Sequence, residues 1–158
     1  MMVSNEVPES LLRTQVLDSG CEVHIADETD FPGHQIKPTD DSRSGRGLRV
    51  ADGKVIPNKG EAQPQFEVDG PQGGKRAISS ASQVAKVSKP LRSVSTICDT
   101  GFEVLFVENG ALVRVPENGH VVCTYPRAGG LYKAEMRLRN PLHPGFGRQG
   151  QQSTSRNT

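Results

Sequence analysis

Two tripeptides in this chain combine a carboxylate, a hydroxyl and a glycine, namely Asp18-Ser19-Gly20 and Asp99-Thr100-Gly101. A carboxylate at the tip of a loop can activate water, an adjacent hydroxyl can hold that carboxylate, and glycine lets a neighbouring backbone approach closely. A motif this short is expected by chance in roughly 5–10% of chains of this length. The sequence context must therefore decide between the two matches.

The context favours the first tripeptide. Asp18 follows the β-type run RTQVL and precedes the run CEVHIA, in which apolar and polar residues alternate. Asp99 instead follows Cys98 at the expected end of a helix, where Gly101 suits a C-cap. We predict that Asp18-Ser19-Gly20 is catalytic and that Asp99 is a structural turn residue. The alternative for Asp18 is likewise a turn residue, in an Asx-type hairpin.

One carboxylate cannot serve as both acid and base. Two close carboxylates that share one proton can do both, because like charges at that range cannot both ionise easily. A chain of 158 residues is too short for two such lobes. A two-fold homodimer supplies the second carboxylate, since symmetry brings Asp18 against its own copy. The expected partners are therefore a second copy of the chain and a peptide substrate.

A metal site is the next candidate, because Cys21 and His24 have ligand-like spacing and His120, Cys98 and Cys123 could complete a set. In a strand, Cys21 and His24 would point to opposite faces. We therefore predict no metal and no cofactor, and a core thiol at Cys21 in place of a nucleophile. A zinc-dependent interaction module remains the alternative.

The elements that would position these residues are short strands and tight turns. Apolar residues make up 34% of the chain, beside 17 glycines and 11 prolines, and no long apolar stripe recurs at helical spacing. We predict an all-β fold, a closed or half-closed barrel with one short helix near residues 92–99. Asp52-Gly53 between two β-prone arms predicts a hairpin over residues 48–57. Residues 27–47 are interpreted as a loop.

Charge and cysteine content narrow the partners further. A net charge of +1 does not favour nucleic acid as a partner. No apolar run approaches the roughly 18 residues of a membrane-spanning helix, so no membrane partner is expected. Three scattered cysteines indicate free thiols in a reducing compartment rather than a disulfide framework.

Four blocks, in this order, resemble the protease region of copia-type retrotransposon polyproteins, and together they cover about residues 13–138: QVLDSGCEVHI (15–25), VADGKVIP (50–57), PLRSVSTICDTGFEV (90–104) and RAGGLY (127–132). The resemblance implies a retropepsin-like fold and aspartic endopeptidase activity on a polyprotein. It carries catalytic roles to Asp18, Ser19 and Gly20 only. It also implies a cytoplasmic setting, in the virus-like particle of a retroelement.

By the same resemblance the hairpin is the flap, with substrate-binding residues Val50, Ala51, Asp52 and Gly53. The expected divisions are a flexible start (1–12), a retropepsin-like domain (13–115), a linker resembling the protease-to-integrase junction (116–138) and a disordered tail (139–158).

Three departures from the family pattern define the main alternative. Cys21 stands where a small residue, usually alanine, is expected, Arg92 stands where the family has leucine, and the flap has few glycines. The alternative is a catalytically inactive remnant, a β-domain that only dimerises or binds peptide.

Overall fold

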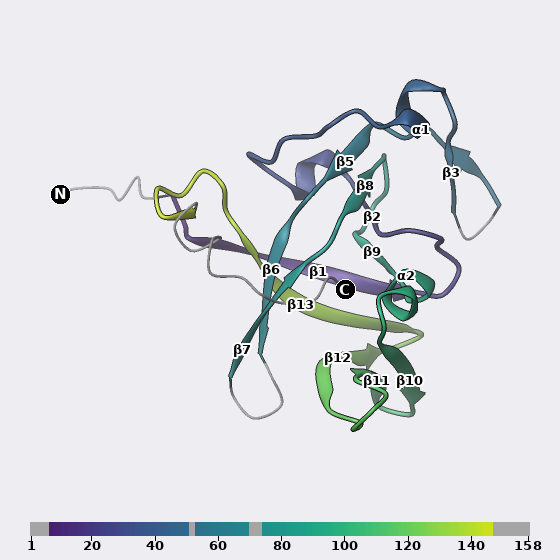
Figure 1. Ribbon diagram of the computed structural model, residues 1–158, viewed down its shortest axis with the longest axis vertical. Helices are drawn as coiled ribbons and strands as arrows, with labels where there is room; N and C mark the ends of the chain where they lie inside the picture. Colours follow the sequence, from purple (N-terminus) through teal and green to yellow (C-terminus); the bar gives the residue numbers. More distant parts are fainter. Residues whose placement is uncertain (1–6, 51–52, 70–73, 147–158) are drawn as a thin grey trace.

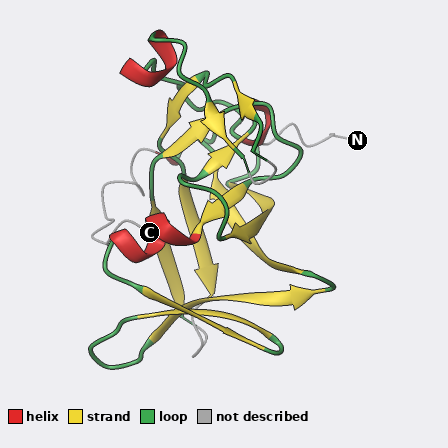
Figure 2. Ribbon diagram, turned by 90° about the vertical axis from the view of Figure 1, so that its right-hand side faces the viewer, coloured by secondary structure: helices red, strands yellow, loops and turns green. Residues whose placement is uncertain are grey.

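The computed structural model describes residues 7–50, 53–69 and 74–146. Strands hold 46% of the residues and the two α-helices are short (Figure 2), which confirms the all-β class. None of the helices in the described ranges is long and apolar enough to cross a membrane.

The strands form one large sheet and a separate hairpin (Figure 1). The strands of the large sheet follow the order β10 (Glu103–Val107), β11 (Gly110–Arg114), β12 (Val121–Ala128), β13 (Leu131–Arg139), β1 (Ser10–Asp18), β9 (Leu91–Ser93), β2 (Ile25–Ala26), β8 (Ser82–Val84) and β5 (Gly60–Ala62). Off this path, β6 (Gln65–Asp69) pairs with β13 and with β7 (Lys75–Ser79). No closed barrel is found among the described residues. The expected closure is therefore corrected to a branched, open sheet.

The longest strand pairing joins the two ends of the chain. β1 and β13 run antiparallel from Ser10 opposite Arg139 to Val16 opposite Lys133. Residues 116–138, expected to be a linker, therefore contribute two strands to the main sheet, and the division at residue 115 is wrong for this fold. In β13 the buried residues Ala134, Met136 and Leu138 alternate with more exposed ones and share one face of the strand.

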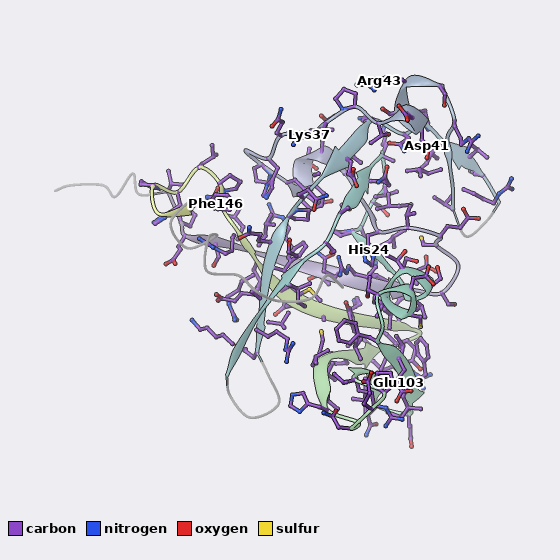
Figure 3. The ribbon with its side chains drawn as sticks, viewed as in Figure 1. His24, Lys37, Asp41, Arg43, Glu103 and Phe146 are labelled. Atoms are coloured by element: carbon purple, nitrogen blue, oxygen red, sulfur yellow. The ribbon has the colours of Figure 1, made fainter. Side chains whose placement is uncertain are left out.

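The segment after β13 is also folded, contrary to the expected tail from residue 139. Asn140 is buried, and its amide nitrogen Nδ2 donates to the carbonyl of Pro8 at 2.9 Å. Further along, the ring of Phe146, labelled in Figure 3, meets the ring of His34 edge-on with centroids 6.4 Å apart. These contacts fix residues 140–146 against the start of β1 and the loop after β2. Likewise residues 10–12, expected to be flexible, are the first residues of β1.

An N-cap residue starts each of the two short α-helices. Ser93 accepts from the amide of Thr96 and starts α2 (Val94–Asp99), which confirms the helix expected near residues 92–99. Thr39 forms a capping box with Ser42 and starts α1 (Asp40–Arg43). This turn of helix, with the 3-10 turn η1 (Glu28–Asp30), corrects the interpretation of residues 27–47 as a loop alone.

The apolar core is divided between two clusters. The larger lies beneath β6, β11, β12 and β13 and includes Phe66, Val122 and Met136, each almost fully buried. The smaller consists of Cys21, Ile25 and Ala85, with partly buried apolar residues packed around it. The smaller cluster lies directly beside the predicted catalytic tripeptide, so its packing bears on the site.

Candidate active site

Asp18 is the last residue of β1, and a buried strand presents it. Gln15, Val16 and Leu17, which precede it, are each less than a tenth exposed. On one side β1 pairs in parallel with β9, so that Val16 lies opposite Leu91 and Asp18 opposite Ser93. The pairing extends through the amide of Val16, which donates to the carbonyl of Pro90 at 2.9 Å. Asp18 therefore lies at a fixed position where the strand ends and a loop begins.

Two hydrogen bonds orient the carboxylate. The backbone amide of Gly20 donates to Asp18 Oδ1 at 2.7 Å, which is the local turn that an aspartate two residues upstream forms readily. The thiol of Cys21 donates to Asp18 Oδ2, with Sγ 3.4 Å from the oxygen. Ser19, predicted to hold the carboxylate through its hydroxyl, is exposed. In the described part of the chain Cys21 supplies the side-chain hydrogen bond in its place.

Cys21 is a donor and not a nucleophile here. Burial, and to a smaller extent the neighbouring Asp18 carboxylate, together raise the pKa of its thiol to about 12. The thiol consequently keeps its proton throughout the neutral and acid range and can donate it to Asp18. Its position beside the smaller core cluster agrees with the core thiol that the sequence favoured.

The loop after Asp18 is held by β9 and α2. Ser93 Oγ donates to the carbonyl of Cys21 at 2.7 Å, and the amide of Ser93 donates to Nδ1 of the buried His24 at 2.9 Å. Thr96 Oγ1 donates to the carbonyl of Glu22 at 3.0 Å. Because these bonds use the groups that would pair in a strand, only Ile25–Ala26 of the expected strand 21–26 is regular. Figure 3 shows His24 close to α2.

The predicted hairpin is present as β3 (Leu48–Arg49) and β4 (Val55–Ile56), paired antiparallel. The amide of Val50 donates to the carbonyl of Lys54, and Gly53 has a positive φ of 86°, as a tight turn requires. Ala51 and Asp52, the other two predicted flap residues, lie outside the described residues. The inner side of the hairpin packs on the smaller core cluster through Leu48, Val50 and Ile56.

The hairpin and the tripeptide face the same cleft, of about 710 Å³. Asp18 and Ser19 lie at its floor between the two structures that wall it. Val50 and Ile56 line it from the hairpin, and Phe106, Leu131 and Tyr132 line it from β10 and β13. In Figure 1 the strand β3 lies at the upper right and β10 at the bottom, with the end of the purple strand β1 between them. The sequence predicted the tripeptide and the hairpin on one side of this cleft.

The second wall was missed. The aromatic rings of Phe106 and Tyr132 meet edge-on with centroids 5.0 Å apart, and Leu131 adjoins them. In the sequence these residues belong to the apolar run FEVLFV (102–107) and to the RAGGLY block (127–132). The first is typical of a strand, and the second carries only the family resemblance. Nothing in either indicated a wall of the site, because the register of β13 on β1 brings Leu131 and Tyr132 to the level of Asp18.

The second tripeptide lies elsewhere. Asp99 is the exposed last residue of α2, and Gly101 adopts a φ of 100° with its amide bonded to the carbonyl of Cys98. Asp99 is not among the residues that line the cleft. This is the helix-end geometry expected of a structural turn.

The proposed ligands of a zinc site do not converge. His24 Nδ1 accepts a hydrogen bond from a backbone amide and Cys21 donates to Asp18. Within the described ranges no group of three histidine, cysteine or acidic side chains could hold a metal ion.

Arg92, which departs from the family pattern, is buried in the larger core region. Its Nη1 donates to Ser80 Oγ at 2.9 Å, and its guanidinium lies 5.9 Å from the centre of the Phe66 ring. It also lines a small cavity of about 10 Å³ together with Cys123 and Tyr125. Burial raises the pKa of Cys123 to about 11. The arginine is thus accommodated by polar and aromatic neighbours away from the cleft.

Comparisons of the chain with protein-family models, with curated proteins and with solved structures found no match.

Proposed function

We propose that this chain is one half of a homodimeric, retropepsin-like aspartic endopeptidase that cleaves a polyprotein, with Asp18 as its catalytic carboxylate. The observation that carries the proposal is the position of Asp18 at the floor of a large cleft, with the hairpin of β3 and β4 on one side. A carboxylate that ends a buried strand, is held by two donors and faces a peptide-sized cleft has the surroundings that this chemistry needs.

The reaction requires the partner subunit's Asp18 as well. One carboxylate of the pair is ionised and removes a proton from water, which attacks the scissile carbonyl carbon. The other is protonated and donates a hydrogen bond to the carbonyl oxygen. On collapse of the tetrahedral intermediate the C–N bond breaks and the leaving amine takes a proton.

The other residues of the half-site hold this geometry. Gly20 and Cys21 fix the rotation of the carboxylate through their hydrogen bonds to its two oxygens. Val50 and Ile56 of the hairpin present apolar surface to the cleft, which excludes water from bound substrate and strengthens the electrostatic interactions inside. The mechanism uses no cofactor. Its natural setting is a retroelement polyprotein in a virus-like particle in the cytoplasm.

A second candidate, a catalytically inactive β-domain that dimerises or binds peptide, is favoured by one observation. Arg92, which stands where the family has leucine, is almost fully buried directly beside Ser93, the residue paired with Asp18. A decayed enzyme could acquire this departure from the family pattern without loss of the fold, because Ser80 and the Phe66 ring contact the guanidinium.

Binding of a pepstatin-type transition-state mimic separates the two candidates. A working dyad binds such a mimic far more tightly than it binds substrate. We expect saturable binding by the dimer at mildly acid pH, measured by calorimetry, and its loss in Asp18→Asn. A proven dimer that binds peptide but not the mimic would support the inactive β-domain.

A further inference from the structure

The cleft carries a charge pattern that catalysis does not require. Two lysines, Lys86 and Lys89, line it beside Ser88, and both are exposed. Among the described residues that line the cleft, Asp18 is the one carboxylate. In the described ranges of the chain, neither lysine forms an ion pair within 4 Å of a carboxylate. Lys59, by contrast, is paired with Glu28 at 2.9 Å. The two ammonium groups therefore stand open to a ligand in the cleft.

The chain keeps Lys89 within reach of a substrate that lies over Asp18. Lys89 lies in the bend two residues before β9, whose Leu91 lies opposite Val16 and whose Ser93 lies opposite Asp18. At about 3.3 Å per extended residue, the four steps from Lys89 to Ser93 span at most roughly 13 Å. A bound peptide in extended conformation covers that distance in about four residues. A side chain up to about four positions from the bond above Asp18 can therefore reach the lysines.

We propose, on the basis of the proposed function, that this cleft selects peptides that carry an acidic side chain up to about four residues from the scissile bond, through Lys86 and Lys89. The opposite wall of Phe106, Leu131 and Tyr132 is apolar, so the lysines give the cleft its single cationic side. An acidic residue gains attraction there, and a basic one is repelled.

A less specific role for Lys86 is balance of a nearby charge. The pKa of Asp27 is lowered first by its hydrogen bonds from Thr29 and then, to a smaller extent, by Lys59 and Lys86. The two lysines that lower the pKa of Asp27 are Lys59 and Lys86, and Lys89 is not one of them. This effect therefore does not explain why Lys86 and Lys89 both line the cleft.

The test uses three fluorogenic peptides that share the same apolar residues around the scissile bond. They differ only in carrying glutamate, glutamine or lysine at the position that the proposal places beside Lys86 and Lys89. The dimer is expected to cleave the glutamate peptide with a kcat/KM about fivefold above the glutamine peptide, and this preference should shrink at high salt. Combined Lys86→Glu and Lys89→Glu substitution should reverse the preference. Lys37→Glu makes one such charge reversal at an exposed residue that does not line the cleft, and it should leave the preference as it is.

Binding to the Asp18→Asn form, measured by fluorescence anisotropy with the same peptides, separates this inference from the proposed function. Suppose that the wild-type dimer cleaves none of the peptides, but that the Asp18→Asn form binds the glutamate peptide best, and only while Lys86 and Lys89 are present. The selectivity then holds and the catalytic assignment fails. Cleavage or binding that is equal for glutamate and glutamine overturns the selectivity. A preference that survives reversal of both lysines overturns it as well, as does failure of every peptide to bind.

Discussion

Asp18 and Ser93 lie directly opposite each other where β1 and β9 pair as parallel strands. From this position Ser93 also reaches the loop that follows Asp18, through Oγ to the carbonyl of Cys21 and through its amide to His24 Nδ1. The chain therefore leaves the site at Asp18, turns, and is bonded back to the strand beside it. The orientation of the carboxylate depends on a residue 75 positions away in the sequence.

Ser93→Ala should destabilise the fold by about 1–3 kcal/mol, because it removes the N-cap of α2 and leaves the carbonyl of Cys21 buried without this donor. Urea unfolding at fixed protein concentration measures the loss. Ser44→Ala, at an exposed helix end, is the control. It should lower the free energy of unfolding by only a few tenths of the loss expected for Ser93→Ala. Equal effects of the two substitutions would contradict the bracing role of Ser93.

Cys21→Ala should keep the fold but lower kcat/KM about fivefold, because the side chain that orients the Asp18 carboxylate is lost. The thiol donates to Asp18 Oδ2, and one weak hydrogen bond of this kind contributes about 1 kcal/mol. Cys21→Ser retains a donor and should lose less activity. Equal kcat/KM for Cys21→Ala and wild type would show that the thiol contributes only packing.

Gly53→Ala should lower kcat/KM about fivefold without unfolding the protein. A Cβ at φ 86° strains the turn by about 1 kcal/mol, and the hairpin is a separate two-stranded unit, so the strain falls on the cleft wall. Gly74→Ala, where a Cβ meets nothing within 4 Å and φ is not positive, serves as control. Unchanged kinetics for Gly53→Ala would argue against a substrate-binding role of the hairpin.

Acid should destabilise the fold in part through His34. Burial lowers the pKa of His34 below 6.5, against the weaker opposing effect of the Pro32 and Phe31 carbonyls. Above 6.5 the ring is neutral in both states, and its contribution to stability is complete. As the pH falls below 6.5 the unfolded chain takes up the proton first, so the free energy of unfolding decreases until the folded pKa is passed.

The ring of His34 contacts Phe31 and Phe146, and the Arg139 guanidinium lies over the Phe146 ring. A charged imidazole would therefore lie among aromatic rings in the neighbourhood of a second cation. His34→Gln should therefore lose less stability than wild type between neutral and acid pH, in urea titrations at fixed protein concentration. His120→Gln, at an exposed turn, should follow wild type. Parallel pH dependences for His34→Gln and wild type would contradict the assignment.

Local patterns predicted much of the half-site. The β-type run before Asp18, the Asp-Gly turn and the helix at Val94–Asp99 each follow from neighbouring residues. The all-β class follows from the absence of long helical stripes. These features depend on turn chemistry and strand alternation, which a short window of sequence contains.

Long-range pairing could not be predicted in the same way. The family resemblance predicts a linker at residues 116–138, yet β13 becomes the partner of β1. The cleft wall at Leu131 and Tyr132 and the lysines at 86 and 89 come together only through that register and the β1–β9 pairing. The thiol donor at Cys21 also escaped prediction, because a tight turn and not a strand connects it to Asp18.

The most direct test of the central claim is self-processing of a polyprotein segment that contains the chain, compared between Asp18→Asn and Asp99→Asn. Asparagine keeps the size of Asp18 and much of its hydrogen bonding but removes the ionisation that the pair shares. Asp99 lies at an exposed helix end, where asparagine is tolerated. We predict that Asp18→Asn abolishes cleavage in a folded dimer, while Asp99→Asn cleaves within a few-fold of wild type. Cleavage that survives Asp18→Asn, or is lost only in a folded Asp99→Asn protein, would contradict the assignment of the site.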